Sequence, residues 1–239
     1  MWWINPEYVV LVALPTFVLS LLATMYTKST FAKYSRVASS RGLTGAEAAA
    51  AILRDQGVRG VAIERVPGSL TDHYDPRTRT LRLSDDVYHS RSLAAIGVAC
   101  HEAGHALQHA TDYSMLGLRS ALLPAAAVGS KLSYVIIFLG LLMSRAPGRG
   151  AGENLILVGA GLFALMVLFT LVTLPVEWNA SARAKTAMVR TGIVSEREGY
   201  AAGEVLNAAF LTYLAAAVSA VLTLLYYLWR AGVFGGRRD

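Results

Sequence analysis

His101-Glu-Ala-Gly-His105-Ala-Leu-Gln-His109 is the most informative stretch of this 239-residue chain, because its first five residues form an HExxH motif. On a helix, histidines four residues apart lie one turn apart on the same face, so that both imidazoles can bind one metal ion. Glu102 then lies beside that ion, where its carboxylate can accept a proton from water. The motif predicts a zinc site on a helix; the alternative is a helix that carries two histidines by chance.

Two neighbouring residues are poorer candidates for the metal. His109 follows His101 by eight residues, about 12 Å along a regular helix, whereas zinc ligands lie about 2 Å from the ion. No glycine between His105 and His109 would break the helix, so we expect His109 to be a polar residue near the helix end. Cys100, the single cysteine, faces away from His101 on a helix, which favours a small core residue over a ligand.

The composition is that of a membrane protein, with 54% apolar and 16% charged residues. A helix that crosses a bilayer needs about 20 apolar residues. We predict a mainly α-helical membrane protein with about four transmembrane helices, at 1–26, 116–143, 154–176 and 208–230, and a tail at 231–239. The span 116–143 is the ambiguous one because it contains Lys131 in its middle. A lysine in lipid is costly, so we expect Lys131 to face protein or a wet cavity.

The basic residues predict the orientation in the membrane. Residues 1–7 contain no Lys or Arg, whereas Lys28, Lys33 and Arg36 follow the first span. The positive-inside rule then places segments 27–115 and 177–207 in the cytoplasm. The arginines of the tail would lie outside, a mild departure from the rule. Topology thus accounts for the net charge of +6, and no phosphate-binding loop or RNA-binding motif indicates a nucleic-acid partner.

Glu177 is the candidate for a third ligand. It directly follows the charge-free stretch 155–176, and two crossings separate it from the HExxH segment, so both lie on the same side of the membrane. The alternative is an ordinary interfacial carboxylate. Two histidines and a glutamate, with one position open for water, are a known catalytic zinc set. Ser181, one turn later, is placed to orient His101 or His105.

Segment 27–115 is predicted to form a small α+β domain that carries the HExxH helix. Thr44 and Glu47 make a capping box at the start of a helix that ends at Gly57. Three short strands are then expected, with turns between them, at 61–66, 70–74 and 78–84. A second helix starts at Ser90 or Ser92 and runs through Gln108.

These motifs resemble the gluzincin branch of zinc proteases, in which HExxH supplies two ligands and the base, and a later glutamate supplies the third ligand. Membrane gluzincins such as the prenyl-protein protease and the bacterial heat-shock membrane protease carry Glu-x-x-Ala-Asp. The stretch Glu177-Trp-Asn-Ala-Ser181 is similar, with Ser in place of Asp. A closer resemblance is to bacterial neutral zinc membrane metallopeptidases. It is carried by Asp72-His-Tyr-Asp-Pro76, Leu83-Ser-Asp-Asp-Val-Tyr-His89, 94–109 and Glu177 to Ser181.

The resemblance covers nearly the whole chain and implies a zincin-like domain and a multi-pass protein of the bacterial inner membrane. With the orientation above, we expect an endopeptidase whose active site faces the cytoplasm and whose partners are a protein or peptide substrate and the lipid bilayer. Zn²⁺ would be bound by His101, His105 and Glu177, with Glu102 as the general base. The sequence carries no indication of the oligomeric state.

Two further features have alternative interpretations, the donor to the oxyanion and the role of strand 78–84. The oxyanion of the reaction needs a donor, and His73, Tyr74, His89 and Arg183 are candidates. Arg183 is favoured because it follows Glu177 by six residues on a helix expected to continue. Strand 78–84 is either a sheet edge that binds substrate as an added strand or an ordinary solvated strand.

The rival function is a membrane scaffold or adaptor whose metal only ties the soluble domain to the helices. A structural zinc site normally has four protein ligands and does not need a glutamate within the motif, so Glu102 favours catalysis. Cleavage within the bilayer is a further alternative. The polar residues Glu102, His109 and Asp112 in and after the motif argue against it, because the motif does not lie in a long apolar run.

Overall fold

The computed structural model describes residues 6–144 and 150–234 and is mainly helical. Four helical segments are long and apolar enough to cross a membrane: Pro6–Tyr34, Ser114–Met143, Gly150–Arg190 and Glu196–Arg230. The first combines α1 (Pro6–Tyr8), a π-helical turn (η1, Val9–Ala13) and α2 (Leu14–Tyr34), and the others are α6, α7 and α8. The expected mainly helical membrane architecture with four apolar helices is therefore confirmed.

The chain divides into two compact units. The bundle unit comprises residues up to Leu21, Gly117–Leu174 and the chain from Tyr213 onward. The site unit comprises Leu22–Leu116 and Pro175–Thr212 and contains the HExxH segment and Glu177. Each of the four long apolar helical segments thus contributes residues to both units. The site unit is made of two stretches of chain that are distant in sequence.

In the bundle unit, small residues allow α6 and α7 to approach closely. A Cβ on Gly140 would lie 2.8 Å from the backbone nitrogen of Ile156, and a Cβ on Gly159 would lie 3.1 Å from that of Ile137. Such close approach is typical of helix packing in membranes. Lys131, which we expect to face protein or a wet cavity, is exposed on α6 in the described part of the chain.

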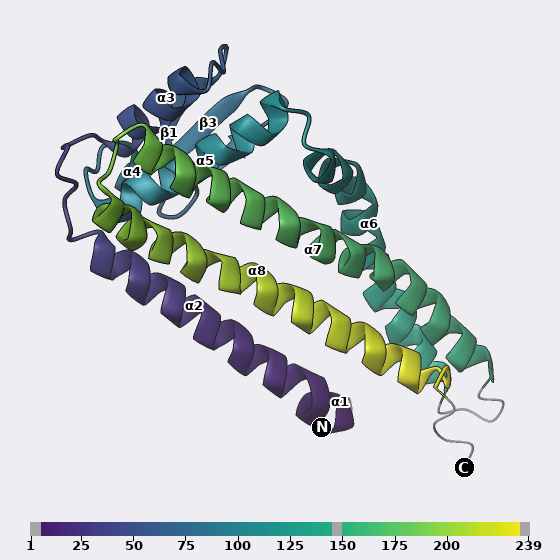
Figure 1. Cartoon of the computed structure of the whole chain (residues 1–239). Coiled ribbons are helices and arrows are strands. Elements are labelled where there is room, and N and C mark those ends of the chain that lie inside the picture. The colour runs from purple at the N-terminus through teal and green to yellow at the C-terminus, as the bar shows by residue number, and fades with distance from the viewer. Residues whose placement is uncertain (1–5, 145–149, 235–239) are drawn as a thin grey trace. The chain divides into compact units, whose positions relative to one another are not determined.

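The site unit contains a small sheet and short helices beside α5 (Leu93–Ala110), as Figure 1 shows. Helix α3 (Gly45–Asp55) begins with the predicted capping box, in which the Thr44 side chain accepts from the Glu47 amide. Ser92 caps α5, since its hydroxyl accepts from the Ala95 amide at 3.2 Å. These two helix starts were predicted correctly, whereas the one-turn helix α4 (Asp85–Tyr88) was not foreseen.

The three strands are β1 (Ala62–Val66), β2 (His73–Asp75) and β3 (Thr80–Ser84), in the order β1-β3-β2. β3 pairs in parallel with β1 and antiparallel with β2. The proposal that 78–84 forms a sheet edge is therefore wrong, because the loop after β1 carries the chain across to the far side of β3. The second strand along the chain, β2, has three residues and is shorter than the expected strand 70–74. Leu70 lies before it, with a positive φ of 56°.

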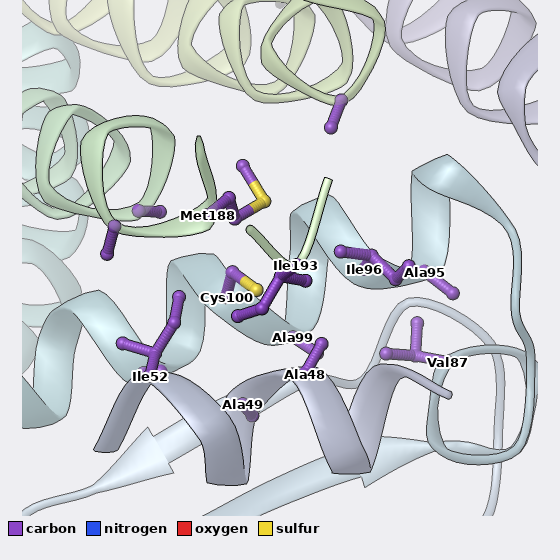
Figure 2. Close-up of a cluster of buried hydrophobic side chains, with 14 of the residues drawn as sticks. Ala48, Ala49, Ile52, Val87, Ala95, Ile96, Ala99, Cys100, Met188 and Ile193 are labelled. Carbon is purple, nitrogen blue, oxygen red and sulfur yellow. The ribbon is translucent and has the colours of Figure 1, made fainter. Parts of the chain in front are cut away.

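The core of the site unit lies on both sides of α5. Figure 2 shows Ala48 and Ile52 of α3 beside Ala99 and Cys100 of α5, with Met188 of α7 and Ile193 nearby. All six side chains are buried, five of them completely and Ile193 to 98%. Full burial raises the pKa of the Cys100 thiol well above its usual value, so Cys100 is an inert core residue as expected.

Candidate metal centre

Helix α5 places both histidines of the motif on the face toward the C-terminal part of α7. The imidazole rings of His101 and His105 lie edge to face with centroids 4.8 Å apart. Their backbone can come this close to α7 because residue 104 is a glycine. A Cβ at Gly104 would lie 2.5 Å from the Ala180 carbonyl oxygen, which is closer than any side chain permits.

Helix α7 continues through the expected end of the span and carries Glu177 to the two histidines. The Oε2 atom of Glu177 lies 3.2 Å from Nε2 of His101 and 3.5 Å from Nε2 of His105. Glu177 is 2% exposed, so its carboxylate is buried against these imidazoles. One potential ligand atom from each of His101, His105 and Glu177 lies within 4.8 Å of the other two. Among the His, Cys, Asp and Glu side chains of the described residues, these three form the group that could hold one metal ion.

The far side of each imidazole is held by a polar partner. Nδ1 of His101 lies 3.0 Å from the Ser181 hydroxyl, so the expected contact between Ser181 and a histidine is present. Nδ1 of His105 lies 3.0 Å from Oε1 of Gln108. Both rings therefore turn Nε2 toward Glu177, an orientation that metal-binding histidines commonly acquire from such outer partners.

Gln108 also fixes which nitrogen of His105 carries the proton. Its Nε2 donates to the Val176 carbonyl at 2.7 Å and to Oδ1 of Asn179 at 3.1 Å, so Oε1 is the atom that faces His105. An amide oxygen only accepts, and Nδ1 of His105 must therefore be the donor. In neutral His105 the lone pair of Nε2 then points toward the Glu177 carboxylate.

Two hydrogen-bond acceptors facing each other in a buried site require a positive charge between them. Burial lowers the pKa of His105, but the Glu177 and Glu102 carboxylates raise it by more, so that its pKa lies above the usual value. A tetrahedral zinc ion with ligands at about 2.0–2.1 Å separates its ligand atoms by about 3.3 Å. The observed 3.2 and 3.5 Å match that spacing, so the residues fit a zinc ion.

Glu102 is buried on α5 between the two histidines in sequence and lies close enough to His105 to raise its pKa. Its carboxylate forms no hydrogen bond or ion pair with any residue in 6–144 or 150–234. A buried carboxylate without a protein partner needs water or a substrate group to satisfy it. Glu102 is thus available for proton transfer beside the three candidate ligands.

The other residues singled out in the sequence lie around this centre rather than in it. His109 lies 2.8 Å from the Tyr74 hydroxyl and is not part of the ligand group, as its helical position predicted. Nε of Arg183 donates to Oδ1 of Asn179 at 2.8 Å, and its guanidinium lies 6.0 Å from the Tyr113 ring. His73 contacts the Thr71 carbonyl and His89 packs on Tyr88, so neither joins the group.

Gln108 and Asn179 are the site residues that the sequence analysis missed. Both look like ordinary polar residues of a helix, yet Gln108 is completely buried and connects α5 to α7 through Val176 and Asn179. The signal was available, because Gln108 follows His105 by three residues on one helix face.

Comparison with known proteins agrees with this geometry. A family model described as "Putative neutral zinc metallopeptidase" matches residues 9–232. The "Putative membrane protease YugP" of Bacillus subtilis (strain 168) is 45% identical over 210 residues, which cover 88% of this chain and 90% of that protein. No solved structure matches. A match over almost the entire chain, with two histidines and a glutamate arranged for one ion, leads to one conclusion: this membrane protein belongs to the neutral zinc metallopeptidase family.

Proposed function

We propose that the protein is an integral-membrane, zinc-dependent endopeptidase that hydrolyses peptide bonds of proteins near the cytoplasmic membrane face. The observation that carries this proposal is the pair of Nε2 atoms directed at the buried Glu177 carboxylate, with Glu102 nearby and without a hydrogen bond or ion pair to any described residue. Three protein ligands leave one tetrahedral position open, which is the arrangement of catalytic rather than structural zinc.

His101, His105 and Glu177 would hold the ion, and Ser181 and Gln108 would keep the two imidazoles oriented. A zinc ion held by these residues would polarise the scissile carbonyl and lower the pKa of its bound water toward 7. Glu102 accepts the proton of the attacking water and delivers it to the amine nitrogen as the peptide C–N bond breaks. Arg183 remains our candidate for stabilising the oxyanion, because it lies on α7 six residues beyond Glu177.

A location at the membrane surface is supported by the residue that follows Glu177. Trp178 is 58% exposed, and Nζ of Lys185 lies 5.7 Å from the centre of its ring. Tryptophan is enriched at the boundary between lipid and water, and lysines extend from there toward the aqueous phase. The centre would therefore lie at headgroup depth, accessible to water and to chain segments that emerge from the bilayer.

For substrate binding, the corrected sheet order favours β2. It is an edge strand of the sheet, and the hydroxyl of its Tyr74 lies 2.8 Å from Nδ1 of His109 on α5. A peptide added along this edge would run beside the helix that carries the motif. Main-chain hydrogen bonds to an edge strand bind many sequences, which suits a protease.

The decisive experiment compares the purified, zinc-loaded protein with Glu102→Gln on a casein-like substrate. The substitution keeps shape and removes the base, so the rate should fall about 10²–10⁴-fold while zinc content and circular dichroism stay unchanged. Glu196→Gln, an exposed position at the start of α8, is the matched control. An equal rate in Glu102→Gln would remove Glu102 from the chemistry, and a wild type with stoichiometric zinc but no hydrolysis would favour the scaffold function.

A further inference from the structure

A pocket of about 310 Å³ lies in the site unit next to the candidate metal centre. Its walls come from the end of α5, the loop after α3, the sheet and α7. The side chains that matter for its chemistry are Arg59, Arg79, Arg183, Tyr74, His109 and Leu107. Apart from Arg183, the candidate for stabilising the oxyanion, none of these side chains has a role in the proposed metal chemistry.

The pocket is strongly cationic. Three arginines line it, and none of the described residues that line it is an aspartate or glutamate. Arg59 and Arg79 form no ion pair with any described residue, and the bond of Arg183 to Asn179 engages only its Nε. Arg79 lies near enough to Tyr74 to favour ionisation of its phenol, although burial dominates and raises the pKa of Tyr74. An anionic group would find several donors here and no opposing carboxylate.

The distance from the metal centre suits a neighbouring side chain of the substrate. His109 lies four residues beyond His105 on α5, about 6 Å along the helix, and Arg183 lies six residues beyond Glu177 on α7, about 9 Å. An extended peptide advances about 3.3 Å per residue. A group held in the pocket would thus be two or three residues away from a bond cleaved at the metal.

We propose that this pocket is a specificity site that binds an acidic side chain of the substrate, two or three residues from the scissile bond. The proposal rests on the proposed protease function. Two observations favour a peptide over a lipid headgroup as the occupant: the walls include the same α5 and α7 that carry the candidate ligands, and Tyr74 of the edge strand β2 lines the pocket. Guanidinium groups bind carboxylates through paired hydrogen bonds, which gives selectivity for Asp and Glu over their amides.

The test uses fluorogenic peptides that carry either Glu or Gln at each of the three positions on both sides of a cleavage site mapped in casein. With the full-length zinc-loaded protein, kcat/KM should be about tenfold or more higher for Glu at one position. In the double variant Arg59→Gln/Arg79→Asn, the ratio of kcat/KM for the Glu peptide to kcat/KM for the Gln peptide should fall to near one. Asparagine is chosen at 79 because it tolerates the positive φ of 51° found there.

Arg77→Gln is the matched control, since it removes an arginine from the same turn but not from the pocket. Equal cleavage of Glu and Gln peptides at every position, or a preference that survives the double variant, would overturn the proposal and leave the protease function standing. A preference that disappears only when phosphatidylglycerol replaces phosphatidylcholine in the surrounding nanodisc would assign the pocket to lipid headgroups instead.

A binding measurement separates the two proposals if no peptide is cleaved. Fluorescence anisotropy on the Glu102→Gln protein compares the Glu and Gln peptides without turnover. Tighter binding of the Glu peptide that is lost on adding Arg59→Gln and Arg79→Asn would support the pocket even if the protease function fails. Equal binding of both peptides would contradict it.

Discussion

Gln108 illustrates how a single side chain can fix the orientation and the protonated nitrogen of a candidate ligand, here His105. Replacing Gln108 with Leu would remove the side-chain partner of Nδ1 of His105 in a buried place, together with the hydrogen bonds that Gln108 donates to the Val176 carbonyl and to Asn179. Loss of such outer partners typically weakens metal binding about 10–100-fold. We predict a loss of that size for Gln108→Leu in competition with a zinc chelator. Gln56→Leu, an exposed position, should bind zinc like the wild type, and equal affinity in Gln108→Leu would show that Gln108 does not orient the ligand.

The proposal that Glu177 is the third ligand has a sharper test. Glu177→Gln keeps the volume of the side chain but removes the charge that opposes the two Nε2 atoms. We predict a fall in zinc affinity of more than about 100-fold, beyond the loss expected for an outer partner, with partial recovery of activity in excess zinc. Asp112→Asn is the control, because this exposed acid near the end of α5 has a positive φ that asparagine accepts. Elemental analysis showing that Asp112→Asn, and not Glu177→Gln, strips the metal would refute the ligand set.

The sequence alone pointed to some residues of the candidate site and not to others. The spacing of His101 and His105 fixes a shared helix face, and the position of Glu177 after a charge-free span pointed to the same membrane side. The spacing of Gln108 to His105 on α5 carried a signal, but the bond from Gln108 to Asn179 joins α5 to α7, and sequence spacing within one helix does not reveal contacts to another.

At the scale of elements, the approach of α5 to α7 depends on Gly104. An alanine there would place its Cβ 2.5 Å from the Ala180 carbonyl oxygen, so α5 and α7 must move apart, and the two histidines on α5 then move away from Glu177 on α7. We predict that Gly104→Ala lowers stability by about 1–3 kcal/mol and weakens zinc binding together with it. Thermal unfolding with and without zinc measures both effects.

Gly117→Ala provides the comparison, because a Cβ at Gly117 meets no other atom within 4 Å. In an exposed helix this change should be neutral or stabilise by about 0.5–1 kcal/mol. If Gly104→Ala and Gly117→Ala change stability and zinc binding alike, the close approach of α5 to α7 at Gly104 is not needed for the site.

Local signals predicted helix starts well and strand order badly. Thr44 and Ser92 cap their helices through their own side chains, so a few adjacent residues determine the outcome. The placement of β3 between β1 and β2 depends on where the loop after β1 crosses, which the alternation of Thr80 to Ser84 does not encode. Likewise, α7 extends to Arg190 because Ala180, Ala184 and Met188 pack in the site unit, well beyond the apolar stretch.

For the whole molecule, the orientation in the membrane remains a prediction that labelling can decide. The loop expected outside includes residues 145–149, which lie beyond the described part of the chain, so exposed positions nearby are used. Ala151→Cys should react with a membrane-impermeant maleimide in intact cells, and Tyr200→Cys only after permeabilisation. The native Cys100 is fully buried and should stay silent. The reverse pattern would place the centre on the outer side.

The division of the site unit into two distant stretches of chain has a consequence for biosynthesis. His101 and His105 leave the ribosome before α6, and Glu177 follows only after most of α7 has been made. At about 5–20 residues per second, the histidines wait several seconds for their carboxylate. A nascent chain of this protein therefore carries two of the three residues of its ion-binding group while its first helices insert, and the group is complete only once the third apolar segment has been made.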